Sequence, residues 1–256
     1  MITQDVFNYM IVGMKAMAVL VFISLFFVNA GYGQFRTKQW GWSLDNRWAW
    51  MFMEAPVFLV MLVIWMGTPL KYMLPQLVLF GLFQLHYFQR SFIFPWLMTG
   101  HSRMPFAIML MGITFNTING IMQGGGLYWF PNPDYTEGAS YLLRWNALCG
   151  ILLFLAGLIV NWHSDHVIRH LRQPGDTRHY LPSKGLYRYV TSANYLGELM
   201  EWVGFAMAAA TPAAWVFPIW TAANLVPRAH AIYKRYVSEF GAKAVGNRKR
   251  LIPFVW

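Results

Sequence analysis

The hydrophobic positions of this chain fall in long, nearly continuous runs, not in the short periodic stripes that cover a soluble core. A helix needs about 20 apolar residues to cross the hydrocarbon of a bilayer. Several runs reach that length, so the pattern predicts an all-α integral membrane protein with seven transmembrane helices. The predicted spans cover residues 6–30, 49–67, 72–97, 105–130, 142–163, 195–211 and 213–233. We expect one membrane domain, 1–256, whose C-terminal segment at 234–256 is cytoplasmic.

The composition agrees with this pattern. Hydrophobic residues make up 57% of the 256 residues and charged residues 12%, about half the charge of a soluble domain. The net charge of +10 could suggest a nucleic-acid partner. The basic residues, however, lie in the joins between apolar runs, where they orient helices, so no nucleic-acid partner is expected. The first run has no basic region or cleavage site before it, so we expect a retained span.

Basic loops alternate along the chain with loops that carry little positive charge. The loops after the first and third predicted spans are basic. Segment 164–193 has five basic and two acidic residues, and the tail from 228 has seven basic residues and one acidic residue. Of the loops between these basic ones, the first contains Lys71, the second contains Asp134 and Glu137, and the third contains no charged residue. Basic loops stay in the cytoplasm. The N-terminus is therefore expected outside and the C-terminus in the cytoplasm.

Ionisable side chains occur inside several predicted spans, where a charge costs at least ~2.5–3.5 kcal/mol and should face the bundle interior. Glu54 lies early in the second span, and His86, Tyr87 and Arg90 share one turn of the third. Glu54 taken alone could equally lie at the headgroups. Arg90 could extend toward the surface, but its position deep in a span favours the bundle interior. His86 is expected to hydrogen-bond a backbone carbonyl between helices.

The fourth span carries a polar face followed by three glycines. Asn116, Asn119 and Gln123 have the spacing i, i+3, i+7, which places them on one side of a helix. They could hold neighbouring helices together or line a functional site, and both interpretations stay open. The triplet Gly124-Gly125-Gly126 is expected to allow close packing or a turn.

Polar stripes recur at the cytoplasmic ends of the last three spans. They comprise Asn161, Asp165, Arg169 and Arg172, if the fifth span continues as a helix; Asn194, Glu198 and Glu201; and Asn224, Arg228 and Tyr236. Guanidinium groups bind phosphate through paired hydrogen bonds, so these stripes fit a nucleotide. No Rossmann fingerprint follows a strand, so helices would hold any dinucleotide. No HExxH and no Cys/His cluster is present, and no metal site is expected.

Several motifs occur in a recognisable order from about residue 29 onward. They are Gly31-Tyr32-Gly33, His86-Tyr87-Phe88 with Arg90, Asn119-Gly120 with Gln123-Gly124, Asn161-Trp162-His163-Ser164-Asp165 with Arg169 and Arg172, the stretch from Leu186 to Glu198 followed by Glu201-Trp202, and the ending Leu251-Ile252-Pro253-Phe254. Together they resemble the steroid 5α-reductase family (3-oxo-5α-steroid 4-dehydrogenases).

This resemblance implies a seven-span fold, NADPH as hydride donor and a 3-oxo-Δ4 steroid or another lipid enone as acceptor. It implies that Glu54 and Tyr87 form a catalytic pair that polarises the 3-keto oxygen while hydride goes to C5 and a proton to C4. The implied cofactor contacts are Tyr32, Arg90, Arg103, Asn161, Asp165, Arg172, Asn194, Glu198, Trp202, Arg228 and Tyr236.

The chain also departs from the pattern of that family. Met53 stands where the animal enzymes often have Gln, and Phe94 stands where a Tyr is expected. Residues 99–104 align poorly, which affects Arg103. These departures concern the substrate and some cofactor contacts more than hydride transfer.

Three alternatives stay open. A trans-2-enoyl-CoA-type reductase is similar and would share the reductive chemistry. A membrane methyltransferase of the isoprenylcysteine carboxyl type resembles the C-terminal arrangement, but it has Arg-His-Pro where this chain has the segment 191–194. A transporter would show inverted repeats, and none is seen. The compact chain favours a bacterial homologue, surrounded by the lipid of the inner membrane, over a protein of the endoplasmic reticulum.

Overall fold

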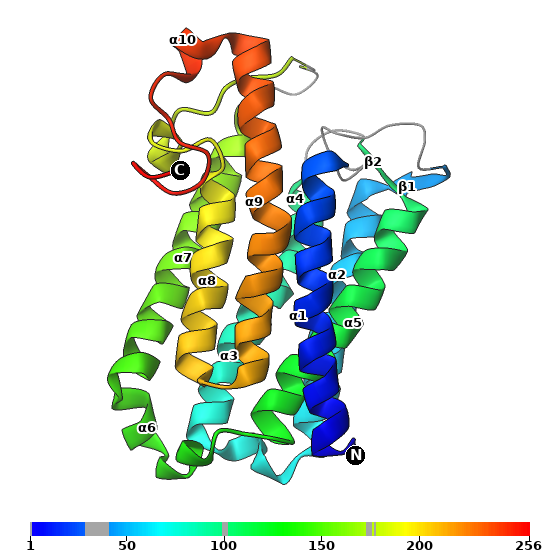
Figure 1. Ribbon diagram of the computed structural model, residues 1–256, viewed down its shortest axis with the longest axis vertical. Helices are drawn as coiled ribbons and strands as arrows, with labels where there is room; N and C mark the ends of the chain where they lie inside the picture. Colours follow the sequence, from blue (N-terminus) through cyan, green and yellow to red (C-terminus); the bar gives the residue numbers. More distant parts are fainter. Residues whose placement is uncertain (1, 29–40, 99–101, 173–175, 177) are drawn as a thin grey trace.

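The computed structural model describes residues 2–28, 41–98, 102–172, 176 and 178–256, which form an elongated helical bundle (Figure 1). The long helices are α1 (Gln4–Phe27), α2 (Asn46–Gly67), α3 (Leu74–Phe88), α5 (Phe106–Tyr128), α7 (Trp145–Arg169), α8 (Ala193–Ala209) and α9 (Pro212–Phe240). Shorter elements are η3 (Pro69–Tyr72), η4 (Gln89–Ile93), α4 (Phe94–Leu97), η5 (Pro133–Glu137), α6 (Ala139–Leu143), η6 (Gly185–Arg188) and α10 (Ala242–Val245).

Each predicted apolar range overlaps one of these long helices, and α3 continues through η4 and α4 to cover the third. Among the described residues, α1, α2, α5 and α7 are long and apolar enough to cross a membrane. These features are those of an all-α membrane protein. Residues 29 and 30, which the prediction put in the first span, lie outside the described residues. α7 ends at Arg169, so Arg172 does not continue its polar stripe as a helix.

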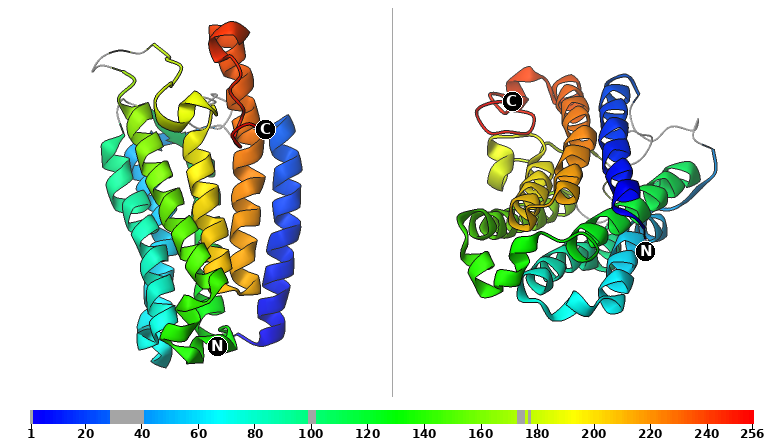
Figure 2. Two further views of the ribbon diagram at one scale, coloured as in Figure 1. Left: turned by 90° about the vertical axis from the view of Figure 1, so that its left-hand side faces the viewer. Right: turned by 60° about the horizontal axis from the view of Figure 1, so that its bottom comes forward.

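The helices pack in pairs around α9. α7 packs along α8, α2 packs along α5, and α1 lies beside α9, which also contacts α8 and α5. The tilted view on the right of Figure 2 shows α9 between the α7–α8 pair and α1. This arrangement brings the C-terminal ends of α3 and α7 to the same end of the bundle as the start of α8. The polar stripes of different spans therefore meet at that end.

Two short strands join the loops before α2 and α5. β1 (Ser43–Asp45) pairs antiparallel with β2 (Arg103–Pro105). Asp45 also caps α2, since its side chain accepts a hydrogen bond from the backbone N–H of Arg47 at 2.9 Å. The sequence did not predict this sheet, because two three-residue strands that pair across some sixty positions leave no alternation to detect.

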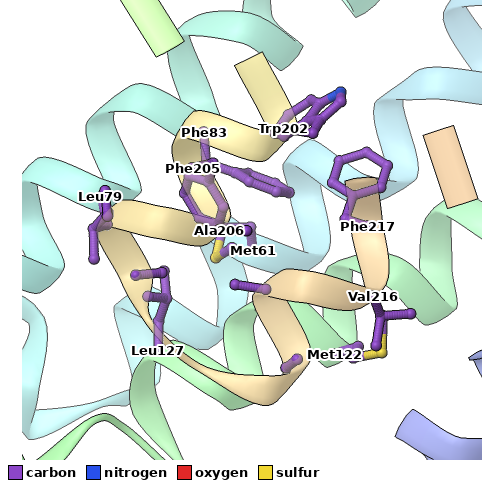
Figure 3. Packing of buried hydrophobic residues seen from close by; sticks show 14 of the residues in the cluster. Met61, Leu79, Phe83, Met122, Leu127, Trp202, Phe205, Ala206, Val216 and Phe217 are labelled. Carbon is purple, nitrogen blue, oxygen red and sulfur yellow. The ribbon is translucent and has the colours of Figure 1, made fainter. Parts of the chain in front are cut away.

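The apolar core is largely aromatic where α3, α8 and α9 meet. Trp202 is fully buried, and its ring centroid lies 4.1 Å from that of Phe217 and 5.7 Å from that of Phe83. Figure 3 shows these residues together with Phe205 in the core. Tyr87 joins the same cluster, with its ring 4.8 Å from that of Phe83. The core therefore holds in place the residue for which the family resemblance implies a catalytic role.

Glycines allow α7 and α8 to pack with their backbones in contact. A Cβ atom on Gly197 would lie 2.5 Å from the backbone nitrogen of Asn161, and one on Gly157 would lie 2.6 Å from the backbone nitrogen of Glu201. Real Cβ atoms do not approach other atoms that closely, so only glycine fits. The triplet Gly124-Gly125-Gly126 is likewise closely packed inside α5, as one of its two interpretations predicted.

A wider turn interrupts the helix formed by α3 and α4. Residues Gln89–Ile93 form a π-turn, closed by a bond from the backbone N–H of Phe94 to the carbonyl of Gln89. Pro95 follows directly, and it has no N–H to donate to the turn before it. π-turns inside α-helices are frequent at functional sites. Arg90 lies in this turn.

Candidate active site

Arg90 connects three helical elements inside the bundle. Its Nη1 atom lies 3.5 Å from Oδ2 of Asp165 on α7, and its Nη2 atom lies 3.8 Å from Oε2 of Glu198 on α8. The guanidinium also lies over the rings of Trp50 and Phe94, 4.8 and 4.5 Å from their centroids. Its side chain is 14% exposed, so Arg90 does not extend to the membrane surface. One cation thus joins polar residues of three predicted spans.

A network of amides links α7 to the start of α8. Asn161 Nδ2 donates to the backbone oxygen of Asn194 at 3.0 Å, and Asn194 Nδ2 donates to Asp165 Oδ1 at 3.2 Å. The hydroxyl of Tyr187, in η6, donates to Asn194 Oδ1 at 3.3 Å. Tyr187 is absent from the predicted site, because a tyrosine in a loop between helices has no periodicity that marks it.

The start of α8 has features of an anion site. No side chain caps its N-terminus, and the hydroxyl oxygen of buried Ser192 has no hydrogen-bond partner among the described residues. Uncapped N–H groups and the helix dipole favour negative charge at such an end. On α9, Arg228 Nε donates to the hydroxyl of Tyr195 at 2.7 Å. These groups lie beside the amide network.

Arg172 and Tyr236 lie at the same end of the bundle. Arg172 is exposed beyond the end of α7, within electrostatic range of Tyr236 on α9. Tyr236 is in turn within electrostatic range of Tyr187 and Tyr195. The structure thus brings these two predicted contacts near the start of α8, although Arg172 reaches it from a loop.

Glu54 on α2 and Tyr87 on α3 lie close enough for the Glu54 carboxyl and the Tyr87 phenol to interact electrostatically. Asn116 on α5 donates from Nδ2 to Glu54 Oε2 at 3.3 Å and to the carbonyl oxygen of Met53 at 2.8 Å. Glu54 is therefore hydrogen-bonded within the bundle. The phenol of Tyr87 lies beside the amide of Asn119, which accepts a hydrogen bond from Gln123 at 3.2 Å. The polar face of α5 therefore both joins helices and lines the site.

His86 pairs with a carboxylate, and not with a backbone carbonyl as expected. Its Nδ1 atom lies 2.7 Å from Oε2 of Glu201, and the two residues are 3% and 0% exposed. The prediction was wrong because residues 115 positions apart give no local sign of pairing. The imidazole lies 5.0 Å from the ring of Tyr87 and 4.6 Å from that of Trp202. This buried pair therefore lies next to the predicted catalytic tyrosine.

The remaining predicted contacts are placed differently. Arg103 is exposed on β2 and hydrogen-bonds Ser43 on the neighbouring strand of the small sheet. Trp202 packs in the aromatic core against Tyr87 (ring centroids 5.6 Å apart) and contributes to the Tyr87 side of the site. Tyr32 lies outside the described residues. The arrangement offers a buried, cation-centred cluster beside a carboxyl–phenol pair.

Replacing Arg90 by methionine should destabilise the protein by about 2 kcal/mol, because two largely buried carboxylates would lose their cation. The cost is limited by contact distances that are long for ion pairs. Thermal unfolding in detergent measures it. Arg144→Met is the matched control, because Arg144 pairs with two carboxylates at an exposed site, where ion pairs contribute little. Equal effects of the two substitutions would contradict the prediction.

Comparison with known proteins supports a family assignment. The family described as 3-oxo-5-alpha-steroid 4-dehydrogenase matches residues 102–256. The chain is 34% identical over 248 residues to 3-oxo-5-alpha-steroid 4-dehydrogenase 1 of Bos taurus, an alignment that covers 94% of this chain and 93% of that protein. It is 36% identical over 230 residues to 3-oxo-5-alpha-steroid 4-dehydrogenase 2 of Homo sapiens (89% and 88% covered). It is 30% identical over 257 residues to Steroid 5-alpha-reductase DET2 of Gossypium hirsutum (99% and 98% covered). The chain belongs to the 3-oxo-5-alpha-steroid 4-dehydrogenase family.

Proposed function

We propose that this protein is a membrane oxidoreductase that uses NADPH to reduce the Δ4 carbon–carbon double bond of 3-oxo-Δ4 steroids. Family membership supports the reaction, since the relatives are named for it. The observation that carries the proposal is the approach of Glu54 and Tyr87 from two helices, within electrostatic range of Arg90. A carboxyl and a phenol placed together in an apolar bundle suit the polarisation of one carbonyl oxygen.

The residues at the start of α8 fit a dinucleotide phosphate. The hydroxyl of Ser192, which has no partner among the described residues, and the uncapped helix N-terminus leave hydrogen-bonding groups for an anion. Arg172 and Arg228 would supply guanidinium groups for phosphates, and Tyr236 would line the same side. Asn161, Asp165, Asn194 and Glu198 would hold the ribose and amide groups, with Arg90 fixing the two carboxylates. Tyr32, Arg103 and Trp202 stay proposed contacts on the resemblance alone.

NADPH, when bound, supplies a hydride to the β-carbon of the enone. The protein must then stabilise the negative charge that develops on the carbonyl oxygen. Tyr87 would donate its phenolic hydrogen to that oxygen, and a protonated Glu54 would donate a second hydrogen bond. Stabilisation of a developing oxyanion by donors placed in advance is usually the largest single contribution to catalysis.

The hydrogen bonds of Asn116 indicate which oxygen of Glu54 carries the proton. A backbone carbonyl can only accept, so the Asn116 atom beside the oxygen of Met53 must be its amide nitrogen. That nitrogen also donates to Oε2 of Glu54, which therefore accepts. Oε1 is then the oxygen on which Glu54 would carry its proton toward the substrate. Asn116 thereby orients the acid.

The membrane arrangement is also part of the proposal. Seven spans would cross the bilayer, with the N-terminus outside and the C-terminus cytoplasmic, in one membrane domain that includes the segment 234–256. The overlap of each predicted range with a long helix supports the count, and the alternating charge of the loops supports the orientation. NADPH would then enter from the cytoplasmic side. A bacterial inner membrane is the location that we propose.

The direct test is NADPH oxidation by the purified protein offered testosterone or progesterone, with identification of the product. NADPH carrying deuterium at the transferred position should give a steroid labelled at C5. A protein with both Glu54 and Tyr87 replaced (Glu54→Leu, Tyr87→Phe) is the control and should leave the steroid unchanged. Failure to oxidise NADPH with any steroid enone would refute the proposed substrate class.

A further inference from the structure

A groove opens between α7 and η6. Its volume is about 480 Å³. One wall is the C-terminal half of α7 and the other is η6 with the residue after it. The lining residues are Ile159, Val160, His163, Ser164, Gly185, Leu186, Arg188 and Tyr189. None of them belongs to the cofactor or carbonyl sites proposed above.

The groove has an apolar end and a polar end. Ile159 is 67% exposed on the outer face of α7, and Val160 and Leu186 continue the apolar lining. The polar end carries His163, Ser164 and Arg188. A ligand that fills both ends must be amphipathic, with an apolar chain beside Ile159 and a polar head toward Arg188.

Ser164 indicates that the polar end is built for a ligand. The residue is 1% exposed, yet its hydroxyl oxygen has no hydrogen-bond partner among the described residues. A hydroxyl in the last turns of a helix usually returns its hydrogen to a carbonyl of the preceding turn. A buried polar group without a partner costs free energy and calls for an explanation. A ligand headgroup in the groove would supply the missing partner.

The charge around the polar end defines the ligand further. His166, on the same stretch of α7, is within electrostatic range of His163, Arg169 and Lys184, all potential cations. Arg188 adds a guanidinium to the lining of the groove. A basic pocket at the cytoplasmic edge of a helix bundle matches the headgroup of an anionic lipid.

We propose that this groove binds one anionic phospholipid, with its phosphate between Arg188 and Ser164 and an acyl chain along Ile159, Val160 and Leu186. A lipid bound here would also affect the proposed cofactor site, since η6 contains Tyr187, which hydrogen-bonds Asn194. A lipid that holds η6 against α7 would hold that tyrosine in place. The binding itself does not depend on the proposed reductase function.

Native mass spectrometry of the detergent-purified protein tests the proposal. After delipidation, the protein is titrated with phosphatidylglycerol or with phosphatidylcholine, and the fraction carrying one lipid is measured. The wild type should bind phosphatidylglycerol at least fivefold more tightly than phosphatidylcholine. Arg188→Gln should abolish that preference, because a charge-assisted hydrogen bond would be lost.

Two further variants keep the test specific. Arg178→Gln is the matched control: Arg178 lies in the same basic segment but already binds Asp176 at 3.1 Å, so lipid preference should persist. Ile159→Trp would fill the apolar end from an exposed position and should weaken both lipids while the thermal unfolding temperature stays within the wild-type range. Equal lipid binding by the wild type and Arg188→Gln would overturn the proposal. So would full competition by inorganic phosphate alone, since the site would then be a free-phosphate site.

Discussion

Tyr87→Phe should lower kcat for steroid reduction by about a hundredfold or more, the usual effect of removing one donor from a developing oxyanion. The ring would keep its contacts with Phe83 and Trp202, so the fold should not change. Glu54→Leu should have an effect of similar size. Glu54→Gln should fall between wild type and Glu54→Leu, because Asn116 would bind the amide oxygen and leave the amide nitrogen facing the substrate as a weaker donor.

The measurement is kcat at saturating NADPH, with NADPH affinity determined separately by quenching of tryptophan fluorescence. The affinity of each variant for NADPH should match the wild type, because neither side chain is assigned to the cofactor. Full turnover by both Tyr87→Phe and Glu54→Leu would remove the carbonyl-binding pair from the mechanism. A loss of NADPH affinity would instead assign these residues to the cofactor.

Gly197→Ala should abolish NADPH binding and destabilise the protein by about 3 kcal/mol or more, the upper end of the effects of overpacking. The added Cβ would lie 2.5 Å from the backbone nitrogen of Asn161. A backbone cannot rotate away as a side chain can, so α7 and α8 must separate. Separation would break the 3.0 Å bond between Asn161 and Asn194, on which the proposed cofactor site depends.

Gly81→Ala is the matched control, because a Cβ atom at this helical glycine of α3 meets nothing within 4 Å. Alanine there should leave NADPH affinity unchanged and raise stability slightly, as expected for an unhindered helical position. Thermal unfolding in detergent and NADPH binding compare the two variants. Similar behaviour of Gly197→Ala and Gly81→Ala would show that the helices tolerate separation.

The helices of this protein could be predicted well from sequence, because each apolar run is long and is bounded by prolines, glycines or charges. The residue at which a helix ends was harder to predict. The spacing of Asn161, Asp165 and Arg169 continues to Arg172, but α7 ends at Arg169. Periodicity shows that residues would share a face if the helix continued, and it does not show where the helix stops.

The sequence predicted which polar residues lie inside membrane spans, where burying a charge costs free energy. It did not predict which of these residues contact one another. Arg90 could be placed inside the bundle because a charge there must find partners, but the choice of Asp165 and Glu198 depends on how α3, α7 and α8 pack. The pairing of His86 with Glu201 depends on the same packing. Tyr187 was missed for a different reason, since it reaches the site from a loop. Such long-range choices are made by tertiary structure.

The π-turn at Gln89–Ile93 determines where this helix can change its length. A π-turn contains one residue more than the α-helical turn that could replace it. If the chain lost one residue here, the segment could form a regular α-helix, and Trp96 and Leu97 would still face their present neighbours. A deletion elsewhere in α3 would rotate everything after it by about 100°. The turn is therefore the one part of the α3–α4 helix where evolution could shorten the chain without repacking its end, and Arg90 would lose its present direction as a result.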